Sequence, residues 1–85
     1  MTVALQVHTI HNLNGIHMRV AGQLASYANK YSGTIELHDK ENKRYANAKN
    51  PLDVLLLQIK FGQQIHINVS GSDVIKTITE VKTLL

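Results

Sequence analysis

The 85-residue sequence predicts an α+β fold, an open-faced two-layer sandwich in which three helices cover one face of a four-stranded antiparallel sheet. Short segments of alternating apolar and polar residues are interleaved with segments of helical spacing, in the order β-α-β-β-α-β-α. The alternation leaves one face of the strands polar, which is typical of antiparallel sheets with one solvated face. No linker, repeat or low-complexity segment interrupts the chain. We therefore expect a single domain over residues 1–85.

The first half of the chain contains two strand patterns and one helix pattern. Residues 3–9 alternate, with their larger apolar side chains on one face: Val3, Leu5 and Val7. After a polar loop, residues 19–31 place apolar side chains at helical spacing, and Gly33 suits the end of that helix. Residues 34–38 predict the second strand, with Ile35 and Leu37 pointing inward.

The second half begins with a charged turn at residues 39–42 and a weaker strand pattern at 43–48. The helix expected over residues 51–60 has a clear start. Asn50 is a favoured N-cap, Pro51 a favoured first residue, and Asp53 complements the helix dipole. This helix is expected to end before Gly62.

The final strand and helix complete the pattern. Residues 64–70 alternate, with Ile65, Ile67 and Val69 on one face. Ser72 and Asp73 are candidate caps for a last helix, which carries one apolar stripe: Val74, Ile78, Val81 and Leu85.

Composition excludes several classes of function. The chain has no cysteine, so it has no disulfide, thiolate nucleophile or cysteine metal site. It shows no signal-peptide pattern and no apolar stretch near the roughly 18 residues that span a bilayer, so we expect a soluble cytoplasmic protein without membrane insertion. The net charge of +3 is scattered along the chain. Scattered charge argues against nucleic acid as a partner and favours acidic protein surfaces.

One histidine is placed where it can act on an anion. His17 follows Gly15 closely and precedes Arg19 by two residues, at the start of the first expected helix. A helix N-terminus offers unpaired backbone amides and the positive end of the helix dipole, which suits phosphate. His17 is therefore a candidate phosphate ligand, or a nucleophile that becomes phosphorylated. The alternative is a solvated loop histidine.

The order of elements and this histidine together resemble the HPr family of bacterial phosphocarrier proteins over essentially the whole chain. The matching residues are Gly15-Ile16-His17, Arg19, Ala21, Lys30, Tyr31, Lys49 and Gly62. HPr proteins belong to the phosphoenolpyruvate-dependent sugar phosphotransferase system. The resemblance implies that His17 accepts a phosphoryl group from Enzyme I and passes it to sugar-specific IIA components. The protein would then be a carrier, without turnover of its own and without a cofactor.

The resemblance also implies roles for other residues. Arg19 is the charge partner of the phosphate, and the backbone amides of Met18 and Arg19 are candidate phosphate donors. The surface that meets partner proteins is expected to include Met18, Val20, Leu52 and Leu55. Leu56 and Ile59 are expected in the core.

Three positions depart from the family pattern. Val20 stands where HPr proteins usually have proline, and Met18 stands where they usually have a small residue. Asn50 stands where many Gram-positive HPr proteins have a regulatory serine, so no hydroxyl is available there. An alternative function is therefore that of a divergent HPr-like paralogue, which binds a regulatory partner without carrying phosphate for sugar transport.

Two further alternatives receive less support. Alternation places His8, His38 and His66 on the outward side of three strands, which would permit a metal site, but solvated histidines are the simpler interpretation and no metal is expected. An RNA-binding module is suggested only by the basic charge, because the chain lacks an aromatic stacking platform and a Gly-x-x-Gly loop.

Overall fold

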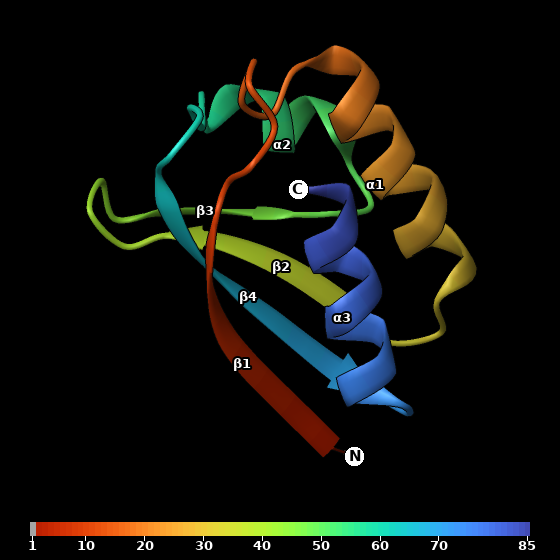
Figure 1. Cartoon of the computed structure of the whole chain (residues 1–85). Coiled ribbons are helices and arrows are strands. Elements are labelled where there is room, and N and C mark those ends of the chain that lie inside the picture. The colour runs from red at the N-terminus through yellow and green to blue at the C-terminus, as the bar shows by residue number, and fades with distance from the viewer. Residues whose placement is uncertain (1) are drawn as a thin grey trace.

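In the computed structural model, which describes residues 2–85, four strands and three helices follow one another in the predicted order (Figure 1). The strands are β1 (Thr2–Thr9), β2 (Thr34–Asp39), β3 (Arg44–Asn47) and β4 (Gln64–Gly71). The helices are α1 (Met18–Lys30), α2 (Pro51–Leu56) and α3 (Val74–Leu84). The predicted α+β class is confirmed.

The strands form one antiparallel sheet in the order β1-β4-β2-β3. The helices lie on one side of this sheet, with α2 at the same end of the molecule as the start of α1 (Figure 1). The inward side chains of β2 and β4 are fully buried: Ile35, Leu37, Ile65, Ile67 and Val69. Within the part of the chain that the structure describes, no helix lies on the opposite face of the sheet, as predicted for an open sandwich.

The two faces of β1 are the reverse of those expected from its sequence. His8 lies opposite Ile65 and is buried on the helix-covered side, whereas Val3, Leu5 and Val7 lie on the open face. Alternation alone does not say which set of side chains faces the helices, because pairing with β4 sets the face. Gln6 is accommodated on the helix side because its Oε1 accepts a hydrogen bond from Lys82 Nζ (3.0 Å).

α2 is shorter than predicted and ends well before Gly62. Leu57 occupies the C-cap, and Gln58 has a φ of 53°, in the left-handed region that a helix cannot continue through. Leu57 and Ile59 are buried, while Leu56 is exposed. The expectation for Ile59 is therefore confirmed, and the core position expected for Leu56 is wrong.

Two polar residues near the strand and helix ends also differ from expectation. Asp39 ends β2 and is buried, where its carboxylate accepts hydrogen bonds from the Asn42 amide and side chain (3.3 and 2.8 Å). Burial by itself raises the pKa of Asp39, but these bonds, together with Gln63 and the Arg44 guanidinium, outweigh it and lower that pKa. Asp73 occupies the N-cap of α3 without a side-chain capping bond.

The apolar stripe predicted for the last helix is buried as expected. No helix within residues 2–85 combines the length and apolar character needed to cross a membrane.

Candidate functional site

The loop that carries His17 is held from two sides by distant parts of the chain. On one side, the Ile16 amide donates to the Ile59 carbonyl (3.0 Å), and the Gly62 amide donates to the Ile10 carbonyl (3.0 Å). On the other side, the Leu85 carbonyl accepts from the backbone amides of residues 11 and 12 (3.0 and 3.4 Å). The position of His17 therefore depends on the segment after α2 and on the end of α3.

Gly15 is required by this close packing. Its φ is +66°, and its amide closes a turn onto the Asn12 carbonyl (2.9 Å). A Cβ at this position would overlap the Ile59 carbonyl oxygen. Only glycine is compatible with both the left-handed backbone conformation and the close approach of these two segments of the chain. This accounts for a glycine two residues before the histidine.

His17 is the N-cap of α1. Its backbone is extended, and its carbonyl accepts the first hydrogen bond of the helix, from Ala21 (2.9 Å). Its side chain makes no capping bond and is half-buried, so the imidazole is not used to satisfy the helix start. An unused ring at this position remains available for chemistry with an external group.

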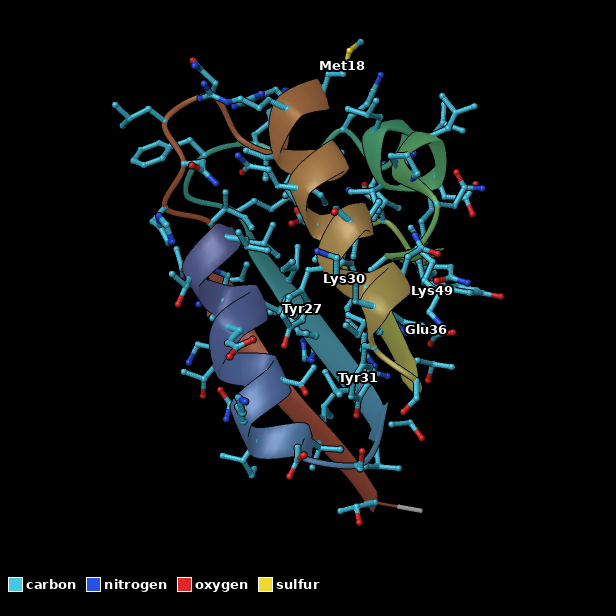
Figure 2. All side chains as sticks on the ribbon, turned by 90° about the vertical axis from the view of Figure 1, so that its right-hand side faces the viewer. Met18, Tyr27, Lys30, Tyr31, Glu36 and Lys49 are labelled. Atoms are coloured by element: carbon cyan, nitrogen blue, oxygen red, sulfur yellow. The ribbon has the colours of Figure 1, made fainter. Side chains whose placement is uncertain are left out.

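The first turn of α1 presents several backbone donors near this ring. The amides of residues 18–20 precede the first bond of the helix and have no partner within it. No acidic side chain lies in this turn to compete for them. Arg19 is exposed, and the Met18 side chain projects into solvent from the end of the helix (Figure 2). Unpaired backbone amides at a helix start favour the binding of an anion, and the imidazole of His17 stands at the same helix start.

Comparison with known proteins agrees with this geometry. Residues 6–85 match the model of the PTS-HPr family, described as the PTS HPr component phosphorylation site. The chain belongs to the HPr family. It is 35% identical over 80 residues to the phosphocarrier protein HPr of Lysinibacillus sphaericus, covering 94% of this chain and 89% of that protein.

Two solved structures are also similar to this member of the HPr family. The histidine-containing phosphocarrier protein of a mycoplasma has a TM-score of 0.83 at 31% identity, covering 95% of this chain and 90% of that one. The phosphocarrier protein HPr of Bacillus anthracis has a TM-score of 0.89 at 21% identity, covering 100% and 99% of the two chains, and supports the fold alone.

One of the residues expected on the partner surface of this HPr-family chain lies elsewhere. Val20 is only 3% exposed and packs in the core with Ala21 and Leu24. The turn of α1 carries position 20 inward, on the same side as position 24 one turn later. We therefore leave the Val20 side chain out of the partner surface, although its backbone amide remains among the donors of the first turn.

α2 contributes two exposed leucines beside the start of α1. Leu52 and Leu56 are each 64% exposed, and Leu55 is partly buried against the core. Val54 and Leu57, three residues apart, take the inward face, so Leu52 and Leu56, four apart, share the outer one. α1 contacts α2 directly. We call Met18, Leu52, Leu55 and Leu56 the docking patch.

Sequence reasoning missed several residues near this end of the molecule. Leu13, in the His17 loop, and Phe61, beside the Gly62–Ile10 bond, are both exposed and apolar. Arg44 donates from its guanidinium to the Leu56 and Leu57 carbonyls (3.2 and 2.8 Å), which closes the C-terminal end of α2. Leu13 and Phe61 lie outside the helices and strands, so neither helical spacing nor alternation signals their exposure, and the reach of Arg44 has no sequence signal either.

The other histidines do not gather at His17. His11 Nε2 lies 3.2 Å from the Lys82 carbonyl, and its ring meets the His8 ring edge-on, with centroids 5.7 Å apart. His38 and His66 are directly opposite each other on the open face, whereas His8 is on the other face, so the outward position predicted for His8 is wrong. Within residues 2–85 no group of three or more potential ligands is placed to hold a metal ion.

Proposed function

We propose that this HPr-family chain is a phosphoryl carrier in which His17 accepts a phosphoryl group from Enzyme I and passes it to a IIA component in the cytoplasm. The observation that carries the proposal is the half-buried imidazole at the N-cap of α1, next to amides without intrahelical partners, in a first turn that has no acidic side chain. The protein holds the group as a covalent intermediate and has no turnover alone.

The chemistry requires a neutral ring nitrogen of His17 to attack phosphorus. An N–P bond forms as the bond between phosphorus and the donor breaks, and the same exchange in reverse delivers the group to the acceptor. The amides of Met18 and Arg19 bind the phosphoryl oxygens, and the Arg19 guanidinium offsets their charge. Val20 adds an amide that the usual proline lacks. Positioning and electrostatics of this kind supply most of what phosphoryl transfer needs.

We also propose that Enzyme I and IIA proteins dock on the docking patch. An exposed apolar cluster next to a reactive group is typical of a protein interaction site. Met18 extends this surface toward His17, where the family usually has a small residue. Its flexible thioether adapts readily to differently shaped partners.

Labelling with phosphoenolpyruvate tests the proposal. With Enzyme I and labelled phosphoenolpyruvate, we expect an acid-labile label on the protein and none on His17→Gln. His66→Gln is the matched control, because His66 is half-buried like His17 but lies on the open face of the sheet, and it should label normally. Arg19→Gln should label more slowly.

Two outcomes would contradict the carrier function. Label on His17→Gln would place the phosphoryl group on another residue. An unlabelled wild-type protein at saturating Enzyme I would favour the alternative, a regulatory paralogue that uses the docking patch without carrying phosphate.

We further propose that the serine-based regulation of many Gram-positive HPr proteins is absent. Asn50 is the N-cap of α2, where its Oδ1 accepts hydrogen bonds from the amides of Leu52 and Asp53 (3.1 and 3.3 Å). It performs the structural role that a serine would perform but offers no hydroxyl to a kinase.

A further inference from the structure

Arg44 joins the edge of the sheet to the end of α2. It is the first residue of β3, and its guanidinium donates from Nη1 to the Leu56 carbonyl (3.2 Å) and from Nη2 to the Leu57 carbonyl (2.8 Å). The last carbonyls of a helix have no partner within the helix, and the planar guanidinium can bind two of them at once. A strand therefore supplies the hydrogen bonds that close this helix.

Asp39 restrains the same guanidinium. It lies directly opposite Arg44 in the pairing of β2 with β3, and its Oδ2 is 3.9 Å from Arg44 Nη2. The Asp39 side chain is only 1% exposed and also accepts a hydrogen bond from the Asn42 side chain (2.8 Å), whereas the Arg44 side chain is 46% exposed. A buried carboxylate that other donors hold in place is a fixed negative charge beside a mobile positive one. Asp39 therefore limits where the guanidinium can lie.

α2 depends on such contacts because it is short. A helix of six residues is not stable on its own and takes its position from the elements around it. At its end, the buried side chain of Leu57 is followed back along the chain by Leu56, which is 64% exposed and belongs to the docking patch. A shift or a rotation of this end would change the direction in which the Leu56 side chain points.

We propose that Asp39 and Arg44 are positioning residues for partner docking, which fix the end of α2 so that Leu56 is presented to Enzyme I and IIA proteins. Neither residue belongs to the docking patch or to the His17 site, so each acts through α2. The inference rests on the proposed function, because it concerns the docking step that precedes phosphoryl transfer.

Charge offers a different explanation for any effect of these residues on docking. Lys43 and Arg44 are neighbouring exposed cations that could attract an acidic partner surface directly. Arg44→Lys separates the two explanations, because it keeps the charge but its single ammonium cannot reproduce the paired donors of the guanidinium. Asp39→Asn separates them by sign. It adds one unit to the net charge of +3, so attraction to an acidic surface would lower the KM, whereas loss of positioning raises it.

Steady-state labelling with Enzyme I and phosphoenolpyruvate measures this effect. Arg44→Lys and Asp39→Asn should each raise the KM for phosphorylation by Enzyme I about fivefold with little change in kcat, because docking is weakened while His17 is untouched. Lys43→Gln, which removes the adjacent cation, is the matched control and should leave both constants unchanged. The double variant should resemble the single variants, because both substitutions disturb one contact.

Hydrogen exchange tests the restraint on α2 in the isolated chain. The amides of Leu57 and Gln58 donate to the carbonyls of residues 54 and 55 at the end of the helix (3.2 and 3.1 Å). Arg44→Lys and Asp39→Asn should speed exchange at these two amides about tenfold through local opening. The Ile67 amide lies in the middle of β4, between two strands, and should change far less. An equal increase at all three amides would indicate general destabilisation and would contradict the proposal.

Three further results would overturn the proposal. These are an unchanged KM in Arg44→Lys and Asp39→Asn, an equal rise of the KM in Lys43→Gln, and a lower KM in Asp39→Asn. The last would show that charge, and not the position of α2, governs docking.

Leu52→Lys distinguishes these failures from failure of the proposed function. If it raises the KM while Arg44→Lys and Asp39→Asn do not, the docking patch stands and only the positioning role is wrong. If the wild-type chain accepts no label at saturating Enzyme I, the carrier function and this inference are wrong together.

Discussion

At the scale of single residues, His8 shows how packing changes the chemistry of a side chain. It lies in the core beneath α3, and its Nε2 is buried without a hydrogen-bond partner. Burial lowers the pKa of His8, and the nearby His11 and Lys82 lower it further, while the Leu85 backbone acts weakly in the opposite direction. The folded state therefore favours the neutral ring.

This lowered pKa predicts a loss of stability in mild acid. The unfolded chain binds a proton at His8 near pH 6.5, whereas the folded chain resists it. The contribution is complete above pH 6.5 and is lost as the pH falls through the lower folded pKa. Urea unfolding at a series of pH values between about 7.5 and 5 should show a falling free energy of unfolding. His8→Gln should flatten this slope. An equal slope in the wild type and in this variant would exclude His8 as its source.

At the scale of elements, α2 combines a well-defined start with an outer face that the core does not need. Asn50, Pro51 and Asp53 begin the helix as predicted, and the backbone of Gln58 ends it after six residues. In so short a helix, Val54 and the adjoining Leu57 supply the inward contacts. Leu52 and Leu56 are left exposed on the outer face, and Leu55 is partly buried.

Substitutions at the N-cap residue of α2 are predicted to affect the free energy of unfolding and phosphorylation by a kinase independently. Asn50→Ala should lower the free energy of unfolding by about 1 kcal/mol, because two amides lose their acceptor, whereas Asn50→Ser should lower it far less. Chemical denaturation measures both changes. Incubated with an HPr serine kinase and ATP, Asn50→Ser should gain a stable phosphate that the wild type does not. A stable phosphate on the wild-type chain would show that another hydroxyl is used.

The outer face of α2 predicts an effect on docking alone. Leu52→Lys should raise the KM for phosphorylation by Enzyme I about tenfold with little change in kcat, since an apolar contact is lost while His17 is untouched. Steady-state labelling at varied Enzyme I concentration gives both constants. Lysine at Ile75 on α3, equally exposed but outside the docking patch, should leave them unchanged. The docking proposal would be wrong if both variants behaved alike.

At the scale of the whole molecule, the His17 site is assembled from segments far apart in the sequence. The loop before α1 is hydrogen-bonded to residue 59 on one side and to residue 85 on the other. α1 is itself tied to the segment before α2, because Asn29 Nδ2 donates to the Lys49 carbonyl (3.0 Å). The orientation of His17 is therefore a property of the complete fold.

Two glycines within a few residues of each other predict opposite effects of the same substitution. Gly15→Ala should destabilise the protein by more than about 2 kcal/mol and slow phosphorylation, because it adds backbone strain and overlaps the Ile59 carbonyl. Gly22→Ala should stabilise it by about 1 kcal/mol, because Gly22 lies within α1 with open space around it. Thermal unfolding distinguishes the two. A tolerated alanine at position 15 would contradict the close packing of the loop.

Much of the fold and the location of the site were predictable from local patterns. Alternation and helical spacing report on neighbouring residues, so they identified all seven elements and the inward residues of β2, β4 and α3. The Gly15-Ile16-His17 segment likewise placed the histidine at a helix start. Capping chemistry at Asn50 was equally local, and the hydrogen bonds expected there are present.

The larger departures from prediction depend on contacts between distant residues. Pairing with β4 turned His8 inward and Val3, Leu5 and Val7 outward, a choice that a two-residue repeat leaves open. Packing against the core, with Gln58 in a left-handed backbone conformation, ended α2 early and exposed Leu56. The same packing buried Val20. Side-chain periodicity depends only on consecutive residues. Which face of a strand or helix becomes buried depends on the element that packs against that face.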